Sequence, residues 1–308
     1  MALFKRAGWF TFLIVALPLM ATAHLAYAQK GAEAIVDDQP PATKETTEPS
    51  ESPEFVRVHK EGKKMQALQT AVVTYQKPGA ADGVEVTLIG AVHIAEASYY
   101  SRLNELFRSF DALLYELVID PDVKLPDPKE RGMSPISTIQ VGMKDALELT
   151  FQLDEIDYEA KNFVHADLTP EEFFKTMNDR QEGLLQMLFR SMGAGLAMQN
   201  SGKSSDLDLL AALVAEDRGR AMRRAFAAQM GTMDSQMAAI TGEDGKSTLI
   251  TERNAKAFRV MDREIEAGKK KLGIFYGAGH LKDMHKRLVE DYGMQPTKTE
   301  WLDAWDLK

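Results

Sequence analysis

The stretch VTLIGAVHIAEASYY, Val86 to Tyr100, decides the fold that the sequence predicts. Five residues typical of a buried strand run into Gly90, His93 follows three residues later, and a helical pattern begins directly afterwards. The same order returns in LGIFYGAGHLKDMH, Leu272 to His285, where a second Gly-x-x-His ends at His280. Two of the six histidines therefore occupy equivalent strand-to-helix turns.

The segments around these turns predict two β-α-β units. The expected elements are, in chain order, strands over 66–76 and 83–93, a helix over 96–110, a strand over 111–118, a strand over 271–280, a helix over 281–293 and a strand over 297–305. Residues from about 136 to 268 are mostly helical in pattern. The predicted fold class is therefore α/β, two β-α-β units in a mixed sheet with a large central helical insertion. Neither unit alone covers both faces of its strands, so we expect one composite domain over 55–308.

The N-terminus has the three parts of a secretory signal. Lys5 and Arg6 precede an apolar run, and small residues end at Ala28, where we expect cleavage. Residues 1–28 are thus a predicted signal peptide, and residues 29–54, rich in Pro, Glu, Thr and Ser, a predicted disordered linker. This indicates a periplasmic or secreted protein without a stable membrane span after cleavage. The alternative is an uncleaved N-terminal membrane anchor, although the apolar run is short for a span.

Charge and cysteine content exclude several functions. The formal charge is −9, and the signal carries two basic and no acidic residues, so the mature chain carries −9 − 2 = −11. An acidic protein has no electrostatic reason to bind nucleic acid or anionic lipid. The chain has no cysteine, which excludes disulfides and thiol chemistry.

The two turns carry the candidate chemistry. Open α/β sheets bind ligands just beyond the carboxyl ends of their strands, which is where His93 and His280 are expected. Gly90 and Gly277 permit sharp turns and close approach of a ligand, so both are candidate substrate-binding positions. Glu116, in the apolar run LLYELV, is costly to bury unless it is paired or bound to a cation. We therefore predict that both histidines and this glutamate hold one divalent metal ion.

A helix pattern over Ser247–Ile265 adds two polar candidates. Asn254 lies on its apolar face with Arg253 beside it, and buried polar groups need partners. Arg253 is predicted either to pair with an active-site carboxylate or to stabilise a developing oxyanion. Asn254 is a candidate substrate-binding residue. The alternative is a solvated arginine with a helix-capping asparagine.

Other residues leave two interpretations open. Asp303 follows His280 by 23 residues, the spacing from His93 to Glu116, so it is either a second site carboxylate or a solvated residue of an edge strand. His285 is predicted to lie on the surface. It follows His280 by five residues, whereas two histidines that bind one metal from the same helix face are four residues apart.

Asp167 is predicted to cap the helix that follows it, with a metal site shared with His165 as the alternative. Thr169, Pro170 and Glu172 form a helix-start signature. Residues 177–237 hold eight of the sixteen methionines, for which a helix–helix core is favoured over an adaptable groove, and a helix is expected from about Ser205.

This combination of motifs resembles the TraB/PrgY/GumN family, which includes the Tiki metalloproteases. The two Gly-x-x-His motifs, the Glu116 strand and the Arg253-Asn254 pair of ITERN match the family, and YEAKNFVHADLTPEEF looks like a segment of its bacterial members. The resemblance spans about residues 65–305. One departure is GAVH in the first motif, where many members carry Thr after the glycine. The resemblance implies a fold related to the erythromycin-esterase and ChaN-like proteins, and peptidase activity with Mn or Co.

The sequence thus predicts an exported metal-dependent hydrolase that cleaves peptide bonds in a peptide or protein substrate. His93, Glu116 and Arg253 are its candidate catalytic residues, with Glu116 acting as metal ligand or as general base. One alternative is a metal-independent esterase with His93 as its base. Another is a non-catalytic periplasmic protein that binds a peptide, haem or another ligand in a Met-lined cleft. The sequence has no Gly-x-Ser-x-Gly, no His-Glu-x-x-His and no phosphate-binding loop.

Overall fold

The structure, a computed structural model, describes residues 53–79, 83–121, 123, 146–182, 211–212, 214–230 and 247–308, with the backbone alone at 229 and 230. The predicted signal peptide, nearly all of the predicted linker and the helix expected from about Ser205 lie outside these ranges. Within them, no helix is both long and apolar enough to cross a membrane.

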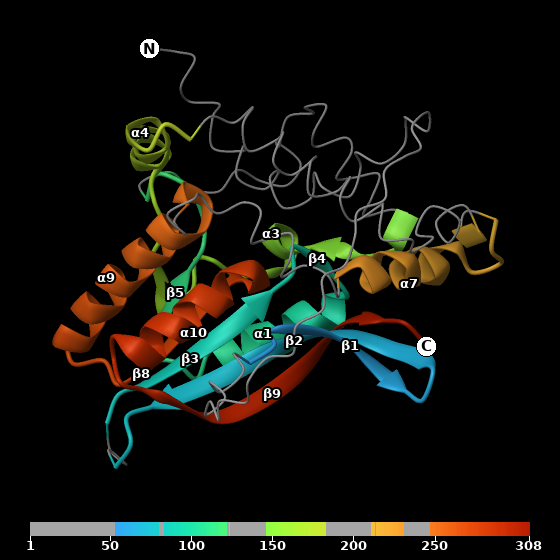
Figure 1. The fold of residues 1–308 in the computed structure, drawn as a ribbon, viewed down its shortest axis with the longest axis horizontal. Coiled ribbons are helices and arrows are strands. Elements are labelled where there is room, and N and C mark those ends of the chain that lie inside the picture. The colour runs from blue at the N-terminus through green and yellow to red at the C-terminus, as the bar shows by residue number, and fades with distance from the viewer. Residues whose placement is uncertain are drawn as a thin grey trace, which may run out of the picture.

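A seven-stranded mixed sheet organises the described residues (Figure 1). Its strands are β1 (Val56–Glu61), β2 (Lys64–Gln76), β3 (Glu85–Ala91), β5 (Ala112–Tyr115), β7 (Phe163–His165), β8 (Lys271–Gly277) and β9 (Gln295–Asp306). Strands β3, β8, β5 and β7 are parallel neighbours in that order, while β2 runs antiparallel to β1, β3 and β9. The predicted mixed α/β class is confirmed.

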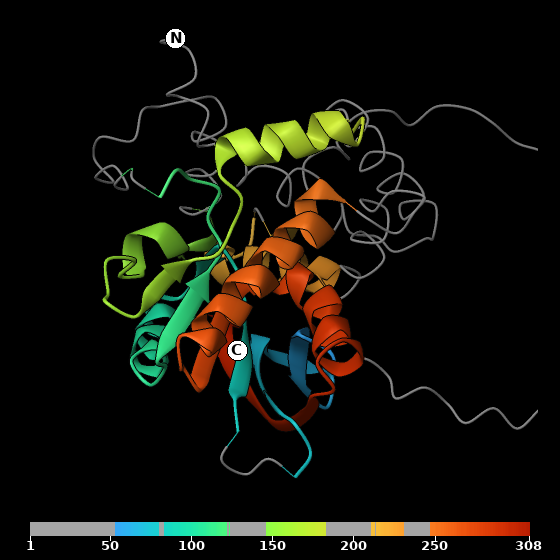
Figure 2. The same cartoon turned by 90° about the vertical axis from the view of Figure 1, so that its left-hand side faces the viewer.

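Helices cover both faces of the parallel strands. On one face, Ile89, Leu113 and Phe275 pack against α1 (Ala97–Phe107). On the other, Leu88, Leu114 and Ile274 pack against α9 (Arg253–Glu266) and α10 (Leu281–Glu290), and Figures 1 and 2 show these helices on opposite sides of the sheet. Because both faces are buried, β3, β5 and β8 read as continuous apolar runs, which is why the sequence reveals them.

The order of strands corrects the prediction of two equivalent β-α-β units. Strands β3 and β5 are parallel, as expected, but β8 lies between them. The helix after β8 leads to β9, which pairs antiparallel with β2 at the far side of the sheet. The second unit is therefore not a parallel β-α-β unit. Sequence order alone does not fix which strands become neighbours, because pairing depends on the whole sheet.

The central insertion over 136–268 is not purely helical. Its described parts include α3 (Gln152–Glu155), α4 (Pro170–Asp179), α7 (Arg218–Met230) and the π-helix η5 (Thr248–Glu252). They also include β7, which extends the main sheet beside β5, and β6 (Thr150–Phe151), which pairs with β4 (Ile94–Ala95). The sequence analysis missed β1, β4, β6 and β7. β4, β6 and β7 have only two or three residues and are too short to show a period of two, while β1 has six residues but alternates only over Val56, Arg57 and Val58 before a polar run.

One local prediction in this region is confirmed. Thr169 is the N-cap of α4 and forms a capping box, because its hydroxyl accepts from the Glu172 N–H and the Glu172 carboxylate accepts from the Thr169 N–H. On α7, Phe226 is buried in the core and Met222 packs against it, but Met187, Met192 and Met198 lie outside the described residues, so a helix–helix core of methionines stays a prediction. Met233 and Met237 lie outside the described residues.

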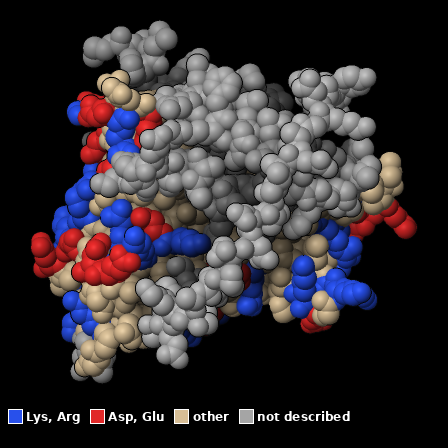
Figure 3. Space-filling view, in the orientation of Figure 1, with Lys and Arg blue, Asp and Glu red and all other residues tan. Residues whose placement is uncertain are grey.

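The coloured surface carries mixed charge. In the face shown in Figure 3, Lys and Arg are interspersed with Asp and Glu, without one continuous basic patch among the residues that the structure describes.

Candidate functional site

Four polar groups follow the carboxyl ends of the four parallel strands. Ala91 of β3 pairs with Gly277 of β8, and Tyr115 of β5 pairs with His165 of β7, so these strands end at nearly the same level. The side chains just beyond them are His93 after β3, His280 after β8, Glu116 after β5 and Asp167 after β7. The sheet thus brings together residues up to 187 positions apart, and α4 lies beyond this edge (Figure 2).

Gly277 marks the centre of the site. The point that a Cβ atom would occupy on Gly277 lies 3.2 Å from Glu116 Oε2, 3.9 Å from His93 Nε2 and 3.9 Å from His280 Cδ2. Glu116 Oε1 lies 3.5 Å from His280 Nε2. All three predicted metal ligands therefore reach one small region that the missing side chain of Gly277 leaves open.

Glu116 is held as a carboxylate. Its Oε1 accepts from Arg253 Nη2 at 2.7 Å, and its Oε2 accepts from the Gly277 N–H. Burial opposes its charge most strongly, but Arg253, His280, His93 and the Gly277 N–H outweigh that effect and lower the Glu116 pKa to about 2. A group with so low a pKa is a poor proton acceptor near neutral pH.

Arg253 occupies the interior of the site with all five N–H groups directed at protein atoms. Nε and Nη2 donate to the Asp167 carboxylate at 2.9 and 2.6 Å, and Nη2 also donates to Glu116. Nη1 points to Leu249 O at 3.5 Å and to His280 Nε2 at 3.4 Å. Burial disfavours its charge, but Asp167 and Glu116 raise the Arg253 pKa above its usual value. Pairing with a site carboxylate is confirmed, and the solvated alternative is wrong. An oxyanion would have to replace one of these partners.

Asp167 is a structural partner of Arg253 rather than a helix cap. Its side chain is fully buried, and its Oδ1 also accepts from the Leu168 N–H at 2.7 Å. The cap of α4 is Thr169, so the capping prediction for Asp167 is wrong. His165 Nε2 donates to Leu117 O at 2.7 Å. Because this nitrogen carries a proton, it is not a ligand of a metal shared with Asp167. An aspartate directly after a partly apolar FVHA run is the signal that identifies such a buried carboxylate.

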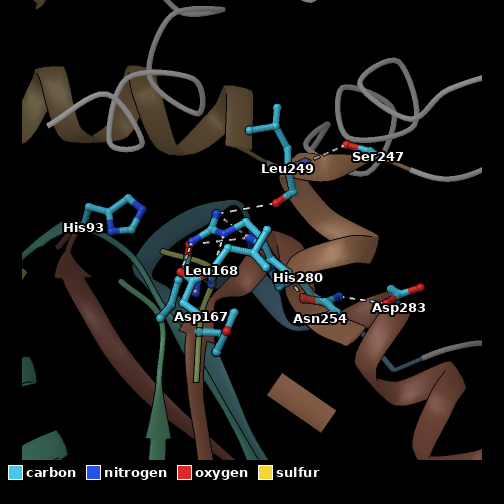
Figure 4. Close-up of polar contacts among 12 residues, drawn as sticks. His93, Asp167, Leu168, Ser247, Leu249, Asn254, His280 and Asp283 are labelled. Carbon is cyan, nitrogen blue, oxygen red and sulfur yellow. Dashed lines mark hydrogen bonds and ion pairs between the residues drawn. The ribbon is translucent and has the colours of Figure 1, made fainter. Parts of the chain in front are cut away.

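His280 is buried and fixed by Asn254 (Figure 4). Asn254 Nδ2 donates to His280 O at 3.1 Å and to Asp283 Oδ2 at 2.8 Å, and both are acceptors only. The amide oxygen must therefore accept from His280 Nδ1, at 2.7 Å, which leaves Nε2 unprotonated and facing Glu116. Burial lowers the His280 pKa to about 4, against an opposing effect of Glu116. Asn254 is 0% exposed, so it orients His280 and offers no surface to a substrate.

His93 reaches the same centre from the opposite side and is half-buried (Figure 4). Its Nδ1 lies 3.2 Å from the side-chain oxygen of Gln152, a residue that the sequence analysis missed. Gln152 follows β6, and no periodic pattern there identifies it.

Gly90 serves packing rather than ligand binding. A Cβ atom on Gly90 would lie 3.1 Å from Leu281 Cδ1 and 3.3 Å from Ala71 O. The space beside Gly90 is thus filled by α10 and β2. The two glycines of the repeated motif have different functions, and only Gly277 faces the site.

Asp303 and His285 lie away from the site. Asp303 on β9 accepts from Gln69 Nε2 at 2.6 Å and lines a separate surface cavity of about 520 Å³ with Glu96 and Arg223. The predicted second site carboxylate is therefore wrong, because β9 runs along the far side of β2. His285 is half-buried rather than a surface residue, with Nδ1 2.9 Å from the Tyr75 hydroxyl.

The whole cluster carries a net negative charge. Glu116 and Asp167 contribute −2 and Arg253 contributes +1, so the cluster carries −1 with both histidines neutral. Within the ranges that the structure describes, no three His, Asp or Glu side chains already stand in metal-coordinating geometry. Comparison of the chain with protein-family models, with curated proteins and with solved structures gives no match.

Proposed function

We propose that this protein is an exported metal-dependent hydrolase of the TraB/PrgY/GumN family that cleaves peptide bonds. The observation that supports the proposal is the approach of His93, Glu116 and His280 to the open position at Gly277. The family fold, related to the erythromycin-esterase and ChaN-like proteins, and the periplasmic or secreted location belong to the same proposal.

The donor set fits a divalent cation. Two imidazole nitrogens and one carboxylate form a common set in catalytic metal sites, where a further position stays open for water or substrate. Two ligands of one tetrahedral ion lie about 3.4 Å apart when each bond is about 2.1 Å long. Glu116 Oε1 and His280 Nε2 are 3.5 Å apart. The net charge of −1 also favours a cation over an anion.

Each candidate ligand already has a partner that prepares it. Neutral His280 presents an unprotonated Nε2, and Glu116 stays ionised beside Arg253. Hydrogen bonds of this kind fix the orientation of metal-binding side chains in known sites. Since the Glu116 pKa is about 2, we assign Glu116 as a ligand rather than as the general base. A divalent cation held there, with Mn or Co as first candidates, would polarise a substrate carbonyl and lower the pKa of a bound water.

Metal analysis and peptide cleavage test the proposal together. The purified protein is analysed for bound metals, titrated with Mn and Co, and incubated with a peptide library before and after chelation. Because loss of a ligand removes the stabilisation that the cation gives the transition state, we expect cleavage that requires the cation and falls at least about 100-fold in the Glu116→Gln and His93→Ala variants. His59→Ala, on β1 outside the site, is the matched control.

Two results would overturn the proposal. Full activity in both site variants, together with no metal binding by the wild type, would exclude this metal site. Cleavage of esters that survives chelation but not His93→Ala would favour the metal-independent esterase.

A further inference from the structure

Gln152 makes two contacts with one residue of the site. Its backbone N–H donates to His93 O at 2.9 Å, and its side-chain Oε1 lies 3.2 Å from His93 Nδ1. The short ladder of β4 with β6 brings this about, because its pair Ile94–Phe151 lies directly beside His93 and Gln152 in the chain. His93 is thus tied to the beginning of α3 through both its backbone and its ring.

The side chain of Gln152 is itself fixed. It is 4% exposed, and its Nε2 donates to the Tyr158 hydroxyl at 2.8 Å. The Tyr158 ring contacts Tyr115, the residue before Glu116, at a centroid distance of 5.3 Å. The structure places the amide oxygen of Gln152 against His93 Nδ1, and an oxygen of this kind only accepts hydrogen bonds.

The arrangement mirrors the one at His280. There, Asn254 Oδ1 accepts from Nδ1 and directs Nε2 toward Glu116. At His93, Gln152 Oε1 meets Nδ1 while Nε2 lies 3.9 Å from the open position at Gly277. A hydrogen bond on one ring nitrogen decides which nitrogen is left to bind a metal.

We infer that Gln152 is the positioning residue of His93, which it holds as the Nδ1–H tautomer with Nε2 turned toward Glu116 and His280. This assignment deepens the proposed function, because it matters for metal binding only if that site binds a metal. The tautomer itself can be measured without any metal.

The primary test is nitrogen NMR of the imidazole rings in metal-free protein, with His93 assigned from a His93→Gln variant. We expect a protonated Nδ1 and an unprotonated Nε2 in the wild type. Gln152→Leu should convert His93 to a mixture of tautomers and leave His280 unchanged. Gln152→Glu, which keeps an acceptor oxygen, should restore the wild-type tautomer even if the leucine variant folds poorly. Gln76→Leu removes a bonded glutamine at the opposite end of the β2–β3 pair and should change neither ring.

A protonated Nε2 in the wild type, or an unchanged His93 tautomer in Gln152→Leu, would overturn the assignment. Metal titration is a separate measurement, in which Gln152→Leu should weaken Mn or Co binding by about 10- to 100-fold. If the wild type binds no divalent cation, the proposed function fails, while the NMR result still decides the role of Gln152.

Discussion

The two Gly-x-x-His turns share a sequence pattern but not a structural environment. In the second turn, Gly277 opens toward the site and His280 is buried against Asn254 and Arg253. In the first turn, Leu281 packs against Gly90 and occupies the space beside it, and His93 is half-buried and contacts Gln152. The same motif therefore creates the centre of the site in one turn and packs the sheet in the other.

This difference shows that the spacing of the motif determines only where the histidine lies. In both turns, a histidine three residues after the glycine lies beyond the carboxyl end of its strand. The function of each glycine and the partner of each histidine come from elements that are distant in the sequence.

Loss of Arg253 should have the largest effect, and it acts on the second turn. Arg253→Met leaves the buried carboxylates of Glu116 and Asp167 without their cation, which should lower the free energy of unfolding by about 3–5 kcal/mol. Urea denaturation measures the change. Arg263→Met, at a largely exposed position of the same helix, is the control and should change stability by less than about 0.5 kcal/mol. Equal effects of both substitutions would contradict the structural role of Arg253.

His280 of the second turn should make the largest contribution to the pH dependence of stability above pH 4.5, and His285, whose pKa is also lowered by burial, should add to it. Between pH 6.5 and about 4 the unfolded chain binds a proton at His280 that the folded protein does not. Stability therefore falls as pH is lowered through this window, by up to about 3 kcal/mol from His280. Below pH 4.5 the low pKa of Glu116 adds a further loss. Denaturation series in small pH steps should show this slope, and His280→Asn should reduce it above pH 4.5.

Alanine in place of each glycine should give the smallest changes and opposite results. In Gly90→Ala, the new methyl group meets Leu281 and the Ala71 carbonyl oxygen, so stability should fall by about 1–3 kcal/mol while metal binding persists. In Gly277→Ala, the nearest atom is the end of the Glu116 side chain, which can shift, so stability should change by less than about 1 kcal/mol.

Metal titration completes this comparison of the glycines. Because the Gly277→Ala methyl group enters the region shared by the three candidate ligands, we expect about tenfold weaker Mn or Co binding or more. A stable Gly90→Ala protein with impaired metal binding, or an unaffected Gly277→Ala protein, would reverse the assignment of the two glycines.

Sequence patterns alone identified the residues that meet at the strand ends. His93, Glu116 and His280 each follow an apolar run, and in a parallel sheet such positions share one edge. The same patterns revealed β2, β3, β5 and β8, because strands covered on both faces leave apolar segments. β9 was predicted as well, although most of its residues are exposed. Arg253 was identified because a charged side chain beside an apolar helix face needs a partner.

Only the tertiary structure decided which groups became partners. The position of β8 between β3 and β5, the pairing of Asp167 with Arg253, and the contact of Gln152 with His93 all join segments far apart in the sequence. Asp303 shows the converse, because its matching spacing led to the wrong side of the sheet. Local sequence determines which residues can form a strand or a turn. Strand order and buried hydrogen bonds depend on packing the whole chain at once, which no local pattern contains.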